Sequence, residues 1–177
     1  MTIDLKEQGG SDLREFNLLN KYTILFLTVT LIVLTDQLTK VYITATMTLH
    51  SSFAIIKGLL NLTYVRNPGA AFGFLANASP WFRSVFFVIV AVLAIGLILY
   101  YIWESRDDEP GLVFALSLIL GGALGNLIDR LRFGEVVDFI DFYISTYHWP
   151  AFNVADSAIS VGAIILIVEV VKRKKEG

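Results

Sequence analysis

Four long apolar stretches divide the 177-residue chain, at residues 22–42, 80–103, 111–131 and 154–171. Each is about as long as a helix must be to cross a hydrocarbon core of roughly 30 Å at about 1.5 Å of rise per residue. Backbone amides in lipid have to pair within their own segment, so these stretches are expected to be helices. The pattern predicts an all-α membrane protein with four transmembrane helices.

The segment between the first two stretches does not resemble a plain loop. Short β-branched or aromatic runs at 53–56, 60–65 and 71–75 are punctuated by turn residues, among them the sequence Asn-Pro-Gly at 67–69. These runs predict a small antiparallel sheet within about residues 43–79, which could lie on the membrane surface. Residues 1–21 are polar and of mixed charge, and are expected to form a separate extension, either a short interfacial helix or a flexible tail.

Four helices place both termini on one side of the membrane, and charge indicates which side. Residues 172–175 read Lys-Arg-Lys-Lys directly after the last apolar stretch, and positive charge marks the cytoplasmic side. We therefore expect residues 1–21 to be a cytoplasmic extension and residues 172–177 a basic cytoplasmic tail. The predicted sheet then lies on the outer side.

The amino-acid composition excludes several kinds of functional site. The chain is 55% hydrophobic and 17% charged, which is more apolar and less charged than a typical soluble domain. A net charge of −2 gives no reason to expect nucleic-acid binding. The chain has no cysteine, which excludes disulfides, thiol nucleophiles and iron–sulfur clusters. His50 and His148 lack the spacing of a zinc motif, so neither a metal nor a cofactor is predicted.

Ionisable residues within or beside the apolar stretches are the main clue to function, since a carboxylate at the centre of a transmembrane helix costs about 2.5–3.5 kcal/mol. Five aspartates lie at the predicted outer ends of the first, third and fourth stretches or in the connection between the last two: Asp36, Asp129, Asp138, Asp141 and Asp156. Their concentration on one side predicts a shared polar pocket at the outer interface.

Asp138 and Asp156 flank the same short outer connection, so their side chains can meet. Two neighbouring carboxylates in a low dielectric tend to share one proton. One can then accept a proton from water while the other donates to a carbonyl or a leaving amine, which would hydrolyse a peptide bond without metal or thiol. A structural role for Asp156 stays open, because Asn153 could cap the fourth helix and the macrodipole favours a carboxylate in its first turn.

Three further polar positions could be structural or functional. Asp36 and Lys40 are four residues apart, so they could form a salt bridge at the end of the first helix or take part in the chemistry. Asn67 could hold its own turn through an Asx hydrogen bond or donate to a substrate carbonyl.

The third stretch ends in the densest polar sequence, GGALGNLIDR at residues 121–130. The first and fifth of these residues form a GxxxG spacing, which is typical of closely packed helices. Asn126, Asp129 and Arg130 share one helix face. Arg130 could pair with Asp129 or bind a carbonyl or phosphate of a substrate. A packing seam with a capped, salt-bridged end explains the same sequence equally well.

Five motifs occur in order along residues 22–171: DQLTK at 36–40, RNPGAAF at 66–72, GALGNLIDR at 122–130, VDF at 137–139 and FNVADS at 152–157. Together they resemble the bacterial lipoprotein signal peptidases, also called signal peptidase II. The resemblance implies an inner-membrane enzyme with four transmembrane helices and a small periplasmic β-cradle. It also implies water-mediated cleavage of diacylglyceryl-modified prolipoproteins just before the lipidated cysteine.

The resemblance assigns the catalytic pair to Asp138 and Asp156. The family's other functional polar positions would fall on Asp36, Lys40, Asn67, Asn126, Arg130 and Asn153, with Asp129 and Asp141 as supporting neighbours. The expected partners are prolipoproteins and membrane lipids, with the protein acting as a monomer and without a cofactor. From the residues alone, a small proton-coupled membrane transporter and a non-catalytic scaffold remain alternatives.

Overall fold

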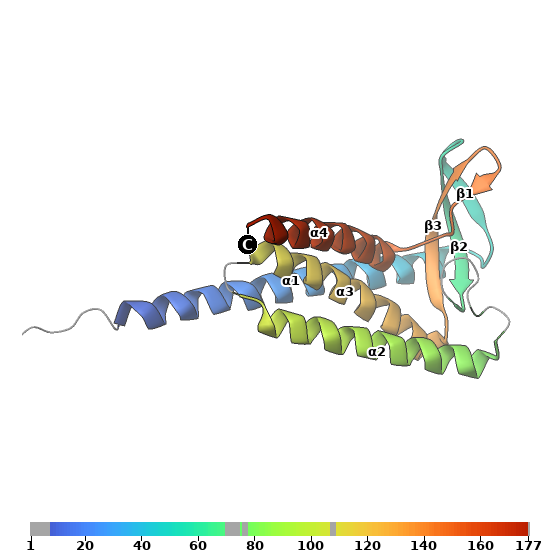
Figure 1. Ribbon diagram of the computed structural model, residues 1–177. Helices are drawn as coiled ribbons and strands as arrows, with labels where there is room; N and C mark the ends of the chain where they lie inside the picture. The colour runs from blue at the N-terminus through green and yellow to red at the C-terminus, as the bar shows by residue number, and fades with distance from the viewer. Residues whose placement is uncertain (1–7, 70–74, 76–77, 107–108, 177) are drawn as a thin grey trace, which may run out of the picture.

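Four long helices run side by side in the computed structural model, which describes residues 8–69, 75, 78–106 and 109–176 (Figure 1). Their bounds are α1 Gln8–Thr46, α2 Pro80–Glu104, α3 Pro110–Phe133 and α4 Val154–Glu176. Each contains a stretch that is long and apolar enough to cross a membrane. The prediction of four transmembrane helices is confirmed.

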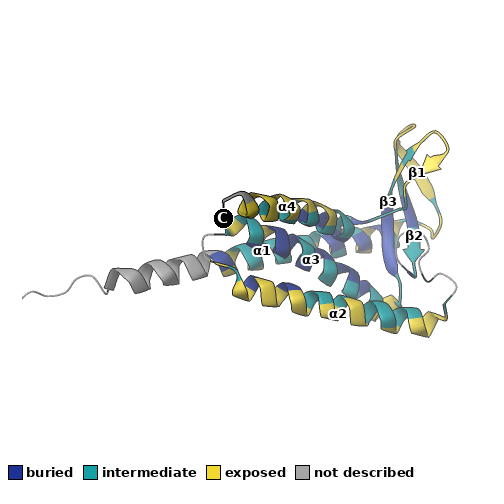
Figure 2. Ribbon diagram, in the orientation of Figure 1, coloured by how far each residue is buried: buried dark blue, intermediate teal, exposed yellow. Residues whose placement is uncertain are grey.

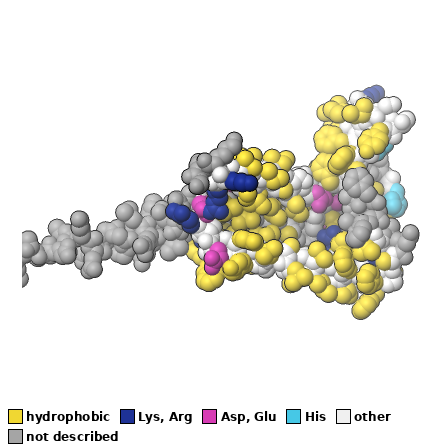
Figure 3. Space-filling view, in the orientation of Figure 1, with side chains coloured by type: hydrophobic (Ala, Val, Ile, Leu, Met, Phe, Trp, Pro, Cys, Tyr) yellow, Lys and Arg dark blue, Asp and Glu magenta, His cyan; other side chains and the backbone are white. Residues whose placement is uncertain are grey.

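α3 is the central helix of the bundle (Figure 2). In its apolar window 56% of the residues are buried, against 11–17% in the other three helices. The helices around it leave large apolar side chains exposed, such as Leu31, Leu93 and Ile164. Figure 3 shows that hydrophobic side chains cover much of the bundle on the face in view. This exposed apolar surface is where lipid would contact the protein.

A four-stranded antiparallel sheet crosses the end of the bundle that lies away from the C-terminus (Figure 1). Its strands, in spatial order, are β1 Ser52–Ile56, β2 Leu60–Asn67, β3 Val136–Ile144 and β4 Tyr147–His148. The first two predicted runs are strands, whereas the run at 71–75 falls outside the described residues except for Leu75. The sheet is not confined to residues 43–79, because its third strand comes from the connection between α3 and α4.

The first helix is longer than predicted. α1 already begins at Gln8, so residues 8–21 continue the helix that contains the first membrane span. Lys21 is buried beside the end of α2, where its Nζ donates to the carbonyl oxygens of Trp103 and Ser105 at 3.1 and 2.7 Å. A cation at the last carbonyls of a helix satisfies groups that have no intrahelical partner.

Glycines on α3 let neighbouring helices approach closely. A Cβ atom added to Gly122 would lie 2.3 Å from the carbonyl oxygen of Ala155 on α4. A Cβ atom on Gly121 would lie 2.9 Å from Ile32 Cβ on α1, and one on Gly125 would lie 2.6 Å from Asp36 Oδ2. The predicted packing seam is confirmed, and it also creates the space in which the polar side chains meet.

We expect Gly122→Ala to lower the melting temperature of the protein in detergent, with a loss of about 1–3 kcal/mol, because the new methyl group meets a backbone carbonyl that cannot move alone. Gly96→Ala on α2 is the matched control, since none of the described residues comes within 4 Å of a Cβ atom there. Equal melting temperatures for the two variants would contradict the close approach of α3 and α4.

Candidate active site

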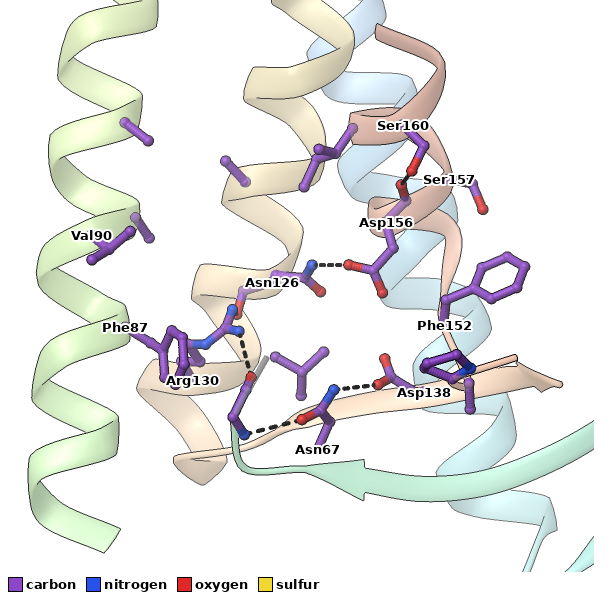
Figure 4. A pocket seen from close by; sticks show the side chains of 18 of the residues that line it. Asn67, Phe87, Val90, Asn126, Arg130, Asp138, Phe152, Asp156, Ser157 and Ser160 are labelled. Atoms are coloured by element: carbon purple, nitrogen blue, oxygen red, sulfur yellow. Dashed lines mark hydrogen bonds between the residues drawn. The ribbon is translucent and has the colours of Figure 1, made fainter. Parts of the chain in front are cut away.

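A pocket of about 700 Å³ opens where the sheet meets the helices (Figure 4). Asp138 reaches into it from β3 and Asp156 from the first turn of α4, so both carboxyl groups face the same space. Asn67, Asn126 and Arg130 also line the pocket. The structure therefore brings together five of the side chains that the sequence singled out.

The remaining predicted residues lie around this pocket at different distances from it. Asn153 is completely buried and contacts Asp138 from behind. Asp36, Lys40 and Asp129 form a buried ionic cluster next to it. Asp141 is the exception, because it pairs with Asn61 and His148 and belongs neither to the pocket nor to this cluster.

Two asparagine side chains hold the carboxylate of Asp138. Asn153 Nδ2 donates to its Oδ1 at 2.7 Å, and Asn67 Nδ2 donates to its Oδ2 at 3.1 Å. The other end of the Asn67 amide accepts a hydrogen bond from Gly69 N at 3.0 Å. Asn67 therefore holds its own turn, as one interpretation of the sequence expected, and the same turn aims its amide nitrogen at Asp138.

Asp156 lies in a reciprocal cap at the start of α4. Its backbone N donates to Asn153 Oδ1 at 2.9 Å, and Asn153 N donates to Asp156 Oδ2 at 3.2 Å. Asn126 Nδ2 donates to the other carboxylate oxygen, Oδ1, at 2.8 Å. The capping role and a place in the pocket are therefore compatible, since the cap fixes the direction in which the Asp156 carboxylate points.

The Asn126 amide links the two aspartates to the ionic cluster. Its Oδ1 accepts from Lys40 Nζ at 3.0 Å and from Asn153 Nδ2 at 3.1 Å. Because the oxygen already faces two donors, the Nδ2 group must point the other way, toward Asp156. Asn153 Nδ2 in turn reaches Asp138, so a continuous chain of amides runs between the two carboxylates.

The buried cluster centres on Lys40, whose Nζ lies 2.9 Å from Asp36 Oδ2 and 2.9 Å from Asp129 Oδ2. Each carboxylate also accepts a backbone hydrogen bond. Ala155 N donates to Asp36 Oδ1 at 2.9 Å, and Val137 N donates to Asp129 Oδ2 at 3.1 Å. These two amides belong to the residues directly before Asp156 and Asp138, so the cluster fixes the backbone that carries both pocket aspartates.

Gln37 is a member of this cluster that sequence reasoning missed. Its Nε2 lies 3.1 Å from Asp36 Oδ2, 3.1 Å from Asp129 Oδ1 and 3.1 Å from the carbonyl oxygen of Gly125. The available signal was a polar amide inside an apolar stretch, between two residues that had been singled out. Gln37 therefore donates hydrogen bonds to carboxylate and carbonyl oxygens that Lys40 alone does not satisfy.

Arg130 lies at the rim of the pocket rather than in the ionic cluster. Its guanidinium contacts the carbonyl oxygens of Asn126 and Gly69, both at 3.4 Å, and lies 5.1 Å from the centre of the Phe87 ring. Asp129, which the sequence offered as its partner, pairs with Lys40 instead. Arg130 thus connects α3 to the turn after β2 and keeps donor groups facing the pocket.

The environment of Asp138 suits proton transfer. Burial raises the pKa of this carboxyl from its ordinary 3.8 to about 7, and the negative charge of Asp156 contributes in the same direction. The hydrogen bonds from Asn67 and Asn153 and the charge of Lys40 oppose this rise. Near neutral pH the carboxyl therefore exchanges a proton readily, which is the property of a general acid or base.

Asp141 lies on the opposite face of β3 from Asp138. It accepts from Asn61 Nδ2 at 2.8 Å through Oδ2, and its Oδ1 lies 2.9 Å from His148 Nδ1. On a strand, residues three apart point to opposite faces. This alternation separates Asp141 from the pocket, and it ties β2, β3 and β4 together instead.

Comparison with known proteins agrees with this geometry. The family model described as signal peptidase (SPase) II matches residues 28–172. The chain belongs to the signal peptidase II family. The family prediction drawn from the five motifs is therefore confirmed, together with a multi-pass membrane fold.

Individual relatives of this signal peptidase II family member cover most of the chain. The lipoprotein signal peptidase of Syntrophus aciditrophicus is 52% identical over 89% of this chain and 99% of its own length. The lipoprotein signal peptidase of Geobacter sulfurreducens is 54% identical over 79% of this chain and 86% of its own length. A solved structure described as a bacterial membrane enzyme superposes with a TM-score of 0.78 at 38% identity, covering 86% of this chain and 90% of its own.

We expect Lys40→Met to destabilise the protein by about 3–5 kcal/mol, because the substitution leaves two buried carboxylates without their cation. Unfolding in detergent would measure the loss. Lys57→Met is the control, since the same chemical change is made at an exposed turn position. A Lys40→Met variant as stable as Lys57→Met would show that the cluster does not hold the elements together.

Replacing Asp138 by asparagine should change how stability depends on pH. The pKa of Asp138 is about 7 in the folded chain, whereas the ordinary value is 3.8. Between these two pH values the folded state binds more protons than the unfolded state, so the folded state loses stability as the pH rises toward 7. Relative to wild type, Asp138→Asn should therefore gain about 2–3 kcal/mol between pH 5 and pH 8. Unfolding at both pH values measures this gain.

Glu135→Gln serves as the control for that experiment, because Glu135 lies in the turn before β3 and outside the pocket. A relative stability of Asp138→Asn that stays constant from pH 5 to pH 8 would mean that burial does not disfavour the ionised carboxylate.

Proposed function

We propose that this chain is a membrane aspartic endopeptidase that removes signal peptides from diacylglyceryl-modified prolipoproteins, cutting just before the lipid-modified cysteine. The observation that carries the proposal is the pair of largely buried carboxyl groups, Asp138 and Asp156, which face one pocket at the end of the membrane spans. The relatives named lipoprotein signal peptidase support the choice of substrate.

In the proposed mechanism the two carboxyl groups share one proton and act on a water molecule between them. The ionised carboxylate takes a proton from the water, while the protonated one donates to the scissile carbonyl oxygen. Attack of the hydroxide forms a gem-diol without a covalent acyl-enzyme. The newly protonated carboxyl then donates its proton to the leaving amine while the other carboxylate takes a proton from a hydroxyl of the gem-diol. The C–N bond breaks, the new carboxylic acid and the amine leave, and the pair again holds one proton. The pair titrates as a unit, so the proton belongs to both.

The surrounding amides support this mechanism by holding the carboxylates without neutralising them. Asn126 and Asn153 fix Asp156 and Asp138 through short hydrogen bonds. Arg130 contacts its backbone acceptors only at 3.4 Å, so its guanidinium can turn toward a substrate carbonyl. We assign Arg130 and Asn67 to binding the substrate backbone beside the scissile bond.

The shape of the pocket fits a substrate that stays in the bilayer. Its walls include small side chains on three helices: Ala91 and Ala94 of α2, Ala123 of α3, and Ser157 and Ser160 of α4. A signal-peptide helix could pack against such walls while its end enters the polar part of the pocket. The two acyl chains beside the scissile bond could then remain in lipid.

The same proposal gives the chain an orientation. The basic residues after α4 favour the cytoplasmic side, and the sheet lies at the other end of the bundle. We therefore propose an inner-membrane protein with both termini in the cytoplasm and the pocket near the periplasmic face. A monomer suffices, because one chain supplies every side chain described for the pocket.

A proton-coupled transporter is the weaker alternative. The polar side chains gather at the sheet end of the bundle, whereas the other half is packed by an apolar cluster that includes Ile98, Ile102, Leu116 and Leu120. Such packing blocks a path for protons across the membrane.

The decisive experiment is cleavage of a diacylglyceryl-modified prolipoprotein by the purified protein in lipid. We expect wild type to cut, and Asp138→Asn and Asp156→Asn each to lose at least about 1,000-fold in rate, because each removes one of the two proton-transfer groups. Asp141→Asn is the matched control on the same strand and should keep its activity, since Asp141 faces away from the pocket.

The outcomes separate the parts of the proposal. Folded Asp138→Asn and Asp156→Asn variants that still cut would remove the catalytic assignment. A wild-type protein that releases no signal peptide would remove the peptidase function itself.

A further inference from the structure

The active-site pocket opens sideways between α2 and α4. In Figure 4, Phe87 and Val90 stand on α2 at one side of the pocket, and Ser160 stands on α4 at the other. Val90 and Val161 both line the pocket, yet they are 46% and 49% exposed. A substrate anchored in the membrane would therefore reach the two aspartates through a lateral entrance between these helices.

One wall of the entrance, α4, is fixed to α3 along much of its length. A Cβ atom added to Gly122 of α3 would lie 2.3 Å from the carbonyl oxygen of Ala155, near the start of α4. One added to Gly162 of α4 would lie 2.8 Å from the carbonyl oxygen of Ala115, toward the other end of α3. Because backbone meets backbone at both places, α4 cannot move away from α3 without breaking this close packing.

The other wall, α2, is packed tightly only toward its C-terminal end. Its buried residues are Ile98 and Ile102, which belong to an apolar cluster shared with α3. Beyond them, the ammonium group of Lys21 binds carbonyl oxygens at the end of the helix. Within α2, none of the residues from 80 to 97 is buried. The outer part of α2 is therefore the wall that can move.

Across the pocket, the outer part of α2 meets α3 through an aromatic contact. The ring centre of Phe87 lies 5.1 Å from the guanidinium of Arg130, and both residues line the pocket. A cation–π contact is weak compared with the burial of a large apolar side chain. It can therefore form and break repeatedly while the C-terminal end of α2 stays in place.

A single glycine separates the packed part of α2 from its outer part. None of the described residues comes within 4 Å of a Cβ atom built on Gly96, whereas such an atom on Gly122 or Gly162 would collide with a neighbouring helix. Close packing thus explains those two glycines but not Gly96. A glycine inside a helix is unfavourable relative to alanine, because it leaves the backbone more freedom. Backbone freedom is the property that Gly96 contributes here.

We propose that α2 bends at Gly96, so that its outer part, residues 80–95, swings away from α4 and lets the signal helix of a prolipoprotein enter the pocket from the membrane. Pro80 precedes Gly96 by 16 residues, or about 24 Å of helix, so a bend of about 20° would move it by about 8 Å. This displacement is comparable with the width of a helix, about 10 Å. The proposal rests on the proposed function for the identity of the substrate.

Return of α2 would also complete the site. The guanidinium of Arg130, which we assign to binding the substrate backbone, can turn more freely while Phe87 is away from it. When Phe87 packs against it again, the directions open to the guanidinium are restricted. One contact would then couple the entry of the signal helix to the alignment of the scissile bond.

Gly96→Ala tests the hinge, because it stiffens α2 and introduces no collision with the described residues. We expect its kcat/KM for a full-length diacylglyceryl-modified prolipoprotein to fall about 2- to 5-fold, since the bend now opposes a better helix former. A short synthetic lipopeptide with the same scissile bond and lipid, but without the signal helix, should be cut as fast as by wild type. Gly96→Ala combined with Leu97→Gly moves the glycine by one position, to an exposed site, and should regain most of the rate.

These results separate the hinge from the proposed function. A wild-type protein that cuts neither substrate would remove the peptidase function. If wild type cuts both substrates, an unchanged rate of Gly96→Ala on the prolipoprotein would overturn the hinge. An equal loss on both substrates would overturn it too, because the substitution would then act on the chemistry and not on entry.

Distance measurements test the motion without relying on activity, and the lack of cysteine in the chain allows labels to be placed freely. Spin labels at Ile89→Cys on α2 and Ile164→Cys on α4 report the width of the entrance. Labels at Tyr101→Cys and Val171→Cys report the packed end, and all four positions are exposed. In lipid vesicles we expect a broad distance distribution for the first pair that narrows with Gly96→Ala, and a narrow one for the second pair throughout. A first pair as narrow as the second would overturn the proposal whether or not the protein cuts.

Discussion

The arrangement of the pocket depends on one lysine ammonium buried between two carboxylates. Lys40 binds Asp36 and Asp129. Each of these carboxylates also accepts a hydrogen bond from the backbone N–H of the residue directly before one of the two pocket aspartates. Four elements, α1, α3, α4 and β3, therefore meet at a single cation. An unpaired charge in this dry position would cost several kcal/mol, so the cluster forms completely or not at all. The positions of Asp138 and Asp156 follow from that requirement.

The cluster acts on the pocket through amides rather than through charge. An asparagine side chain accepts hydrogen bonds at its oxygen and donates them from its nitrogen. Because Lys40 binds the oxygen of Asn126, the nitrogen points at Asp156 and donates to its carboxylate. A lysine or arginine in direct contact with Asp138 would pull its pKa down and strip the proton at neutral pH. Two amides, those of Asn126 and Asn153, lie between Lys40 and Asp138, so the charge of Lys40 opposes the rise in the pKa of Asp138 only weakly, and the value stays near 7.

The sequence predicted the helices and the gathering of aspartates well, because length, apolarity and the cost of burying charge act locally. It did not predict β3, since Val136–Ile144 becomes a strand by pairing with β2, about 70 residues earlier in the chain. The strand conformation also determines on which face the side chain of Asp141 lies. On a helix, Asp138 and Asp141 would share a face, whereas on a strand they separate. Gln37 escaped notice because its role depends on Asp129, which only tertiary packing brings near.

The candidate pair is divided between two kinds of element, and this division places a constraint on how the sheet packs against the helices. Asp156 sits on a spanning helix, and Asp138 sits on a sheet that crosses the end of the bundle. The distance between the carboxylates therefore changes whenever the sheet tilts against the helices. The Lys40 cluster resists tilting near the pocket, but β1 and the end of β3 extend well beyond it. The cluster therefore holds Asp138 and Asp156 in register at the place where the sheet crosses the helices, because it binds the backbone directly before both residues.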